Sequence, residues 1–91
     1  MKRVTAQIQG IVQGVSFRYY ILKHARDFGL RGVVKNELDE SVCLVAEGEE
    51  KKLKELIDLC RVGPKYAKVK SLEFEMKDCK ENKYTEFSIE Y

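Results

Sequence analysis

Two glycines, a serine and an arginine stand close together in the stretch GIVQGVSFR, which runs from Gly10 to Arg18. Gly10 and Gly14 can take backbone angles that gather consecutive main-chain N–H groups into one concavity. The guanidinium of Arg18 is a rigid, positively charged fork of donors that can bind two phosphate oxygens at once. These residue types suit a phosphate site. The alternative is a tight connection with an exposed arginine, and the spacing alone supports both interpretations.

The flanking elements place this stretch at the start of a helix. Residues 3–9 alternate between apolar and polar side chains, which predicts a half-buried strand. Apolar side chains recur at helical spacing over residues 17–28, with Ser16 as the expected N-cap and Gly29 as the C-terminal stop. A helix N-terminus carries unpaired N–H groups and partial positive charge. We therefore expect the loop, the helix end and Arg18 to converge on one small anion.

The middle of the chain predicts two strands and a second helix. Residues 31–38 and 41–47 have strand patterns around a short turn near Asp39–Glu40. Residues 49–61 place apolar side chains on one helical face, and Gly63–Pro64 should end that helix.

The last third of the chain predicts two further strands. Residues 66–76 form one strand with an expected slip near Lys70–Ser71, because the apolar positions change parity there. Residues 86–91 alternate and predict a short closing strand. The order predicts an α+β fold: a two-layer sandwich of the ferredoxin-like, split βαβ type (βαββαβ), with both helices on one face of an antiparallel sheet.

Composition narrows the class of protein. Ninety-one residues with 44% hydrophobic content are expected to form one domain over residues 1–91. A net charge of +2 with mixed signs predicts no nucleic-acid stripe. We find no run long enough to span a membrane and no signal peptide, so we expect a cytoplasmic protein.

The cysteines and the single histidine predict packing rather than chemistry. Cys43, Cys60 and Cys79 are widely spaced and form no CxxC pair, so they are interpreted as reduced structural thiols. With only His24 beside them we expect no metal site, and His24 itself is interpreted as a residue at the edge of the core. Tyr19 and Tyr20 are likewise interpreted as packing residues.

Four segments of the sequence resemble the acylphosphatase family. The stretch IQGIVQGVSFR resembles the first signature of that family, and GVVKNELDESVCLVAEG resembles the second. The segments GPKYAKV and FSIEY are also similar to family features, so the resemblance covers nearly the whole chain. The family pattern usually has an aromatic residue in place of Val33 and a glycine in place of Glu40. The second departure falls in the predicted turn, where glycine would relieve a positive φ.

The resemblance implies an enzyme that hydrolyses small acyl phosphates without a metal or cofactor. It implies that Arg18 binds phosphate and that Asn36 orients the attacking water. Topology agrees, because the two parallel strands of a split βαβ unit end at the same edge of the sheet, and parity puts Asn36 on the side of Val34. The alternative for Asn36 is a turn residue that caps its own backbone. The phosphate cradle would consist of the main-chain N–H groups of Gln13, Gly14, Val15, Ser16 and Phe17.

We expect a monomer whose partner is a small acyl phosphate, with phosphate or sulfate as product or inhibitor. RNA-recognition domains share this architecture but stack bases on aromatic residues of the central strands. Here the outward positions of the first strand are Thr5, Gln7 and Gln9, so we expect no RNA binding. A non-catalytic, regulatory phosphate pocket is the other alternative, because fold does not dictate function.

Overall fold

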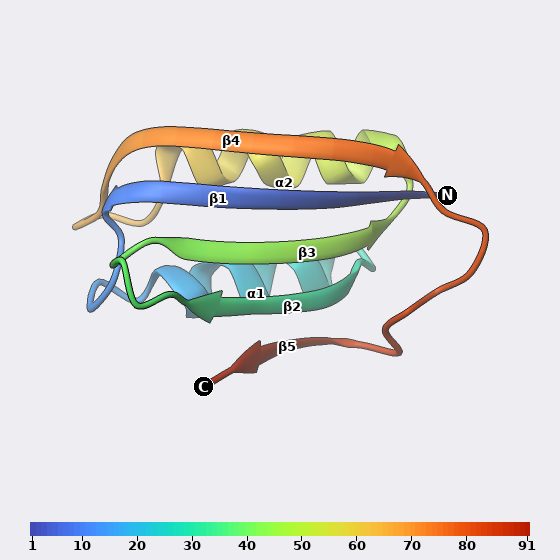
Figure 1. The fold of residues 1–91 in the computed structure, drawn as a ribbon, viewed down its shortest axis with the longest axis horizontal. Coiled ribbons are helices and arrows are strands. Elements are labelled where there is room, and N and C mark those ends of the chain that lie inside the picture. Colours follow the sequence, from blue (N-terminus) through green and yellow to red (C-terminus); the bar gives the residue numbers. More distant parts are fainter.

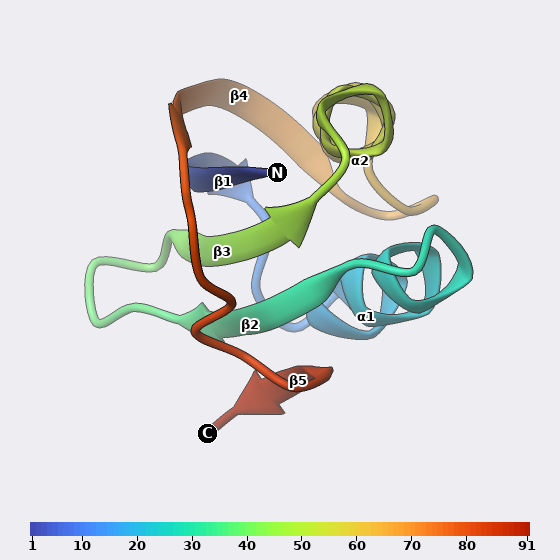
Figure 2. The same ribbon diagram turned by 90° about the vertical axis from the view of Figure 1, so that its right-hand side faces the viewer.

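A computed structural model describes residues 1–91 as a five-stranded sheet with two helices on one face (Figures 1 and 2). The predicted fold class and order of elements are confirmed. The elements are β1 (Lys2–Ile11), α1 (Phe17–Asp27), β2 (Arg31–Asn36), β3 (Val42–Gly48), α2 (Glu50–Val62), β4 (Lys68–Asp78) and β5 (Phe87–Glu90).

The strands lie in the order β4-β1-β3-β2-β5. Since β1 and β2 both pair antiparallel with β3, they run parallel and end at the same edge of the sheet. The expectation of an antiparallel sheet holds for every pair except β2 and β5, which are parallel, so the sheet is mixed. The reason is visible in Figure 2: the segment after β4 crosses the ends of β1 and β3 before β5 begins. The chain therefore enters β5 from the end where β4 stopped, and it runs opposite to β4.

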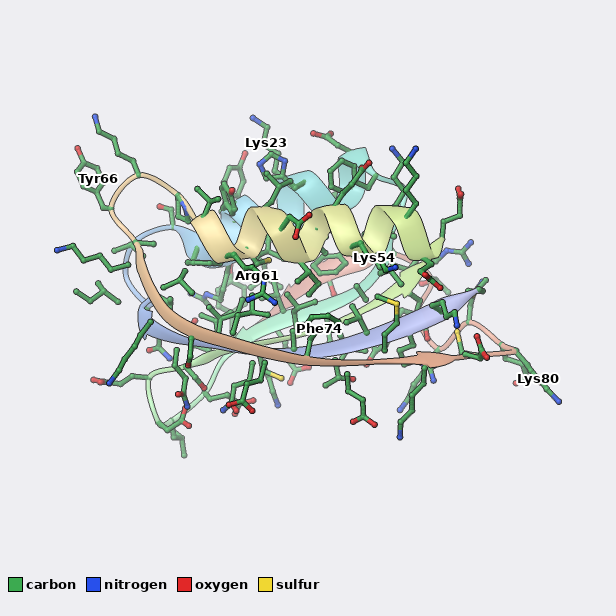
Figure 3. The ribbon with its side chains drawn as sticks, turned by 90° about the horizontal axis from the view of Figure 1, so that it is seen from above. Lys23, Lys54, Arg61, Tyr66, Phe74 and Lys80 are labelled. Carbon is green, nitrogen blue, oxygen red and sulfur yellow. The ribbon has the colours of Figure 1, made fainter.

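Each helix buries one apolar face against the sheet. Glycines end both helices as predicted: Gly29 has φ 71°, and the N–H groups of Gly29 and Leu30 donate to the carbonyls of Arg26 and Ala25. Gly63, with φ 73°, follows α2. Viewed from above, both helices lie on the same side of the strands, and Lys23 lies on the side of α1 away from them (Figure 3). The fully buried core side chains come from both layers and include Val4, Ala6, Ile8, Ile21, Ala25, Val34, Leu44, Leu53, Leu56 and Cys60.

A β-bulge interrupts the pairing of β1 with β4. Gln9 pairs with Ser71 but Gly10 pairs with Val69, so Lys70 is the extra residue and the apolar parity changes there, as predicted. Gly10 has φ 134°, and a Cβ on it would lie 2.1 Å from the Lys68 carbonyl oxygen. The expectation that Gly10 helps to shape a phosphate concavity is therefore wrong: it belongs to β1 and permits close approach of β4.

The cysteine and histidine interpretations agree with the structure. All three cysteines are free, and burial raises the pKa of the Cys60 thiol to about 12. His24 is half-buried on α1, with its ring centroid 4.7 Å from that of Tyr20 and 6.4 Å from that of Phe28. Neither helix is long and apolar enough to cross a bilayer.

Candidate active site

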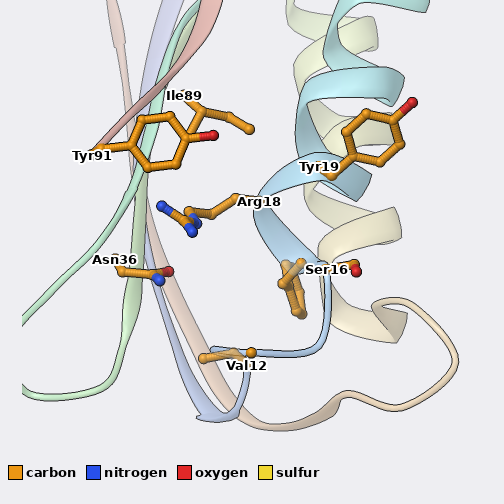
Figure 4. A pocket seen from close by; sticks show the side chains of 9 residues that line it. Val12, Ser16, Arg18, Tyr19, Asn36, Ile89 and Tyr91 are labelled. Atoms are coloured by element: carbon orange, nitrogen blue, oxygen red, sulfur yellow. The ribbon is translucent and has the colours of Figure 1, made fainter.

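A pocket of about 350 Å³ opens where β1 and β2 end, beside the first turn of α1 (Figure 4). Its walls come from three separate parts of the chain: the β1–α1 loop with the start of α1, the end of β2, and β5 with the residue after it. The polar lining consists of Gly14, Ser16, Arg18 and Asn36, and the apolar lining of Val12, Phe17, Tyr19, Ile89 and Tyr91.

The β1–α1 loop leaves its main-chain donors free. No N–H group of residues 13–16 donates a hydrogen bond within the protein, and the helical bonds begin only with Tyr20, which donates to the Ser16 carbonyl at 3.0 Å. Gly14 and Ser16 both have positive φ, 74° and 65°. Ser16 stands at the N-cap position of α1, but its hydroxyl makes no capping bond, unlike the prediction. Unpaired donors at a helix N-terminus attract an anion.

Only part of the predicted cradle lines the pocket. Gly14, Ser16 and Phe17 are lining residues, whereas Gln13 and Val15 belong to the same loop without lining it. The Gln13 side chain instead fastens the loop to the β2–β3 turn, because its Nε2 donates to the carbonyls of Glu37 at 2.8 Å and Ser41 at 3.0 Å.

The β2–β3 turn, to which Gln13 is bonded, also contains hydrogen bonds of its own. The N–H of Glu37 donates to the Ser41 carbonyl at 2.8 Å, and the N–H of Ser41 donates to Asp39 Oδ1 at 3.0 Å. The Ser41 hydroxyl also donates to Asp39 Oδ1, and these two hydrogen bonds hold the pKa of Asp39 below its usual value. Because Asn36 immediately precedes this turn, the two hydrogen bonds of Gln13 join the β1–α1 loop to the chain next to Asn36.

Arg18 and Asn36, which the sequence singled out, are brought together in this pocket. In Figure 4 the guanidinium of Arg18 extends from α1 toward the strands and lies between Asn36 and Tyr91. Asn36 ends β2 on the same side of the sheet as fully buried Val34, as its parity predicts. Its side-chain Oδ1 is buried and accepts no hydrogen bond from any protein donor. The pocket therefore holds a free cation, free N–H donors and a free acceptor.

The sequence did not predict the aromatic side of the pocket. Tyr19 is 63% exposed and lines the pocket, so its interpretation as a packing residue is wrong. Tyr20 does pack, with its ring edge-on to Phe17 and its hydroxyl donating to the Leu59 carbonyl at 2.9 Å. Tyr91 lies beside Arg18, whose Cζ is 4.9 Å from the ring centroid. The alternation of Phe87, Ile89 and Tyr91 was the available signal for this wall.

The two departures from the family pattern lie outside the pocket. Glu40 has φ 74°, so a non-glycine residue does occupy a left-handed position in the β2–β3 turn. Val33 pairs with Val45 and Ser88 on the face of the sheet opposite to Val34. Neither residue lines the pocket.

Comparisons with known sequences and structures identify the family. Residues 4–89 match the Acylphosphatase family. The chain is 46% identical over 90 residues to an acylphosphatase of Caldivirga maquilingensis, covering 98% of this chain and 94% of the relative. The crystal structure of acylphosphatase from Bacillus subtilis superposes with a TM-score of 0.94 at 33% identity, covering all of both chains. An acylphosphatase structure from Coxiella burnetii gives a TM-score of 0.89 at 31% identity, over 98% of this chain and 92% of that one.

Proposed function

The chain belongs to the acylphosphatase family of hydrolases, and we propose that Arg18, Asn36 and the loop N–H groups carry out its reaction. The substrate is an acyl phosphate, a mixed anhydride of a carboxylic acid and phosphoric acid. The attacking water forms a new P–O bond, and the bond between phosphorus and the acyl oxygen breaks. The carboxylate leaves with the electron pair of that bond, and inorganic phosphate is the second product.

Binding of the phosphoryl group is assigned to Arg18 and the N–H groups of Gln13 to Phe17, of which Gly14, Ser16 and Phe17 line the pocket. Phosphoryl transfer develops little covalent bonding for a protein to assist, so catalysis comes from positioning and from stabilising charge on the phosphoryl oxygens. A guanidinium and a helix N-terminus provide fixed positive charge at the place where that charge lies. These donors need no reorganisation, because the protein itself does not use them.

Positioning of the water is assigned to Asn36. Its unpaired Oδ1 can accept a hydrogen bond from a water molecule and hold that molecule in line with the bond that breaks. A carboxylate is a good leaving group, so the water needs orientation more than a strong base. The proton that the water loses passes to an oxygen of the phosphoryl group, which keeps the reaction balanced without a histidine.

The observation that carries this proposal is the convergence of unpaired donors, Arg18 and the unpaired Asn36 acceptor on one pocket. The test is release of inorganic phosphate from acetyl phosphate by the purified protein in the presence of EDTA, measured against the spontaneous rate. We expect catalysed release at equal rates with and without EDTA. A protein that binds phosphate but releases none from acetyl phosphate would be a regulatory phosphate pocket, and the proposal would fall.

We further propose that the enzyme acts as a cytoplasmic monomer formed by one domain. The three free cysteines support a reducing compartment. Phosphate and sulfate should inhibit competitively, because each presents tetrahedral oxygens to the same donors. Size-exclusion chromatography with light scattering measures the oligomeric state.

A further inference from the structure

Gln13 makes the only side-chain hydrogen bonds of the β1–α1 loop. Its two bonds to the carbonyls of Glu37 and Ser41 use both N–H donors of the side-chain amide. Glu37 directly follows Asn36, and its own N–H donates to the same Ser41 carbonyl, so the two acceptors lie together at the base of the β2–β3 turn. Gln13 therefore joins the loop to the turn at the point where the chain leaves Asn36.

The loop makes few other contacts that could hold it in one position. Its ends are anchored by Val12 and Phe17, each 1% exposed, but hydrophobic burial is not directional. Between these anchors the N–H groups of residues 13–16 have no partner within the protein. Ser16 also has a left-handed φ of 65°, which a non-glycine residue adopts only at a cost. The bonds of Gln13 are thus the directional contacts that the loop makes with the strands.

The proposed reaction divides its work between two separate pieces of the chain. The phosphoryl group is assigned to the loop N–H groups and to Arg18, which belong to one continuous segment, residues 13–18. The water is assigned to Asn36, which ends β2 and pairs there with Val42. The side chain of Gln13 links these two pieces, although Gln13 does not line the pocket. In-line attack needs the water and the phosphorus atom aligned, and a misplacement of about 1 Å can cost roughly a hundredfold in rate.

We propose that Gln13 is a positioning residue, whose side-chain amide sets the bound phosphoryl group in line with the water that Asn36 holds. The inference rests on the proposed function. Without the two hydrogen bonds, the loop and Arg18 still present the same donors to phosphate, so phosphate binding is retained. The phosphorus atom and the water lose their alignment, so the chemical step slows. The side chain of Gln13 acts through Asn36 and does not itself touch the substrate.

The test is the kinetics of Gln13→Met, which keeps the length of the side chain and removes both donors. With acetyl phosphate we expect kcat to fall about tenfold, while KM and the inhibition constant of inorganic phosphate stay within about twofold of the wild type. Gln13→Glu also lacks the donors and should lose at least as much kcat, so it serves if Gln13→Met does not fold. Unchanged kcat would overturn the proposal. Phosphate inhibition that weakens in parallel with kcat would also overturn it, because Gln13 would then support phosphate binding alone.

Gln7→Met is the matched control, because Gln7 contacts the same turn from a different element. Its Nε2 donates to Ser41 Oγ at 3.2 Å and to Asp39 Oδ2 at 3.5 Å, from β1 rather than from the loop. This variant should match the wild type in kcat and in phosphate inhibition. A loss of kcat equal to that of Gln13→Met would mean that any disturbance of the turn slows the reaction, and the role of Gln13 would fall.

The double variant Gln13→Met with Asn36→Ala tests whether Gln13 acts through Asn36. Without the Asn36 acceptor no oriented water remains to be aligned, so the double variant should have the kcat of Asn36→Ala within about twofold. Losses that multiply would place the effect of Gln13 elsewhere and overturn the inference. Absence of turnover of acetyl phosphate by the wild type would instead remove the proposed function itself.

Discussion

Polar groups differ in their hydrogen bonding between the two ends of the sheet (Figure 1). The strands β1 and β2 stop at one end, and β3 stops at the other. At the first end the loop N–H groups, the Arg18 guanidinium and the Asn36 Oδ1 have no hydrogen-bond partner within the protein. Near the end of β3, the side chain of Glu47 is fully buried, and both of its carboxylate oxygens accept hydrogen bonds.

Glu47 is held by groups from two distant parts of the chain. Arg3 donates from Nε at 2.8 Å and also forms an ion pair with it through Nη2. The N–H groups of Lys83 and Tyr84 donate to Oε1 at 2.9 and 3.2 Å. Burial by itself would raise the pKa of Glu47, but the hydrogen bonds from Lys83, Arg3 and Tyr84 outweigh it and lower the pKa. Glu47 thereby ties the segment between β4 and β5 to the sheet.

The comparison separates stability from function. A buried polar group that the protein satisfies stabilises the fold, whereas one that it leaves unsatisfied is a cost that a ligand can remove. Substitutions at the Glu47 end should therefore change the free energy of unfolding, and substitutions at the Arg18 end should change turnover.

Arg18→Ala should have the largest effect. Loss of a positioned cation beside the phosphoryl oxygens should lower kcat/KM for acetyl phosphate by roughly a thousandfold. Steady-state kinetics measure the rate, and the midpoint of urea unfolding should stay close to that of the wild type. Lys23→Ala on the outer side of α1 is the control and should retain full activity. Near-normal turnover by Arg18→Ala would refute its assignment.

Asn36→Ala should lower kcat by about a hundredfold, because the water loses its orienting acceptor. Inhibition by inorganic phosphate should persist, since Arg18 and the loop donors remain. A competition assay measures both quantities in one series. A parallel loss of turnover and of phosphate inhibition would assign Asn36 to phosphate binding instead.

Glu47→Gln should lower the free energy of unfolding by about 2 kcal/mol, because the charged acceptor of two N–H groups and of Arg3 is replaced by a neutral amide. Urea unfolding at neutral pH measures the difference. Glu75→Gln, which breaks an exposed pair with Lys77, is the control and should cost less than about 0.5 kcal/mol. Equal effects of the two changes would contradict the comparison.

The stability that Glu47 contributes should also depend on pH. Because its pKa in the folded protein lies below the ordinary value of 4.5, the contribution is fully present above that pH. It should disappear as the pH falls through the lowered pKa, when the folded protein takes up the proton. The gap between the wild type and Glu47→Gln should therefore narrow below pH 4.5. A constant gap across that range would mean that the charge of Glu47 is not the cause.

Glu40→Gly should have the smallest effect and the opposite sign. Glycine removes the cost of a left-handed position but loses more entropy on folding, so a net gain of at most about 1 kcal/mol is expected. Thermal unfolding measures it, with activity unchanged. Leu38→Gly in the same turn, where φ is not positive, should destabilise instead. A loss of stability in Glu40→Gly would show that the turn carries no strain at Glu40.

Local sequence patterns determined the secondary structure of this protein. Periodicity predicted all seven elements, the glycine stops at Gly29 and Gly63, and the bulge at Lys70, because each depends on neighbours along the chain. The same patterns placed Asn36 on the inner face of β2. The resemblance to a family implied that Arg18 and Asn36 act at one site.

Tertiary structure alone decided which distant groups meet. Glycine is needed at position 10 because the Lys68 carbonyl lies close to it. Gln13 donates to the Glu37 carbonyl because the β2–β3 turn lies beside the β1–α1 loop. The parallel direction of β5 brings Tyr91 to Arg18, and the crossing segment before β5 brings two N–H groups to Glu47. Periodicity specifies the face on which a side chain lies, but partners from remote segments are selected only when the elements pack, because that is where distance and burial are set.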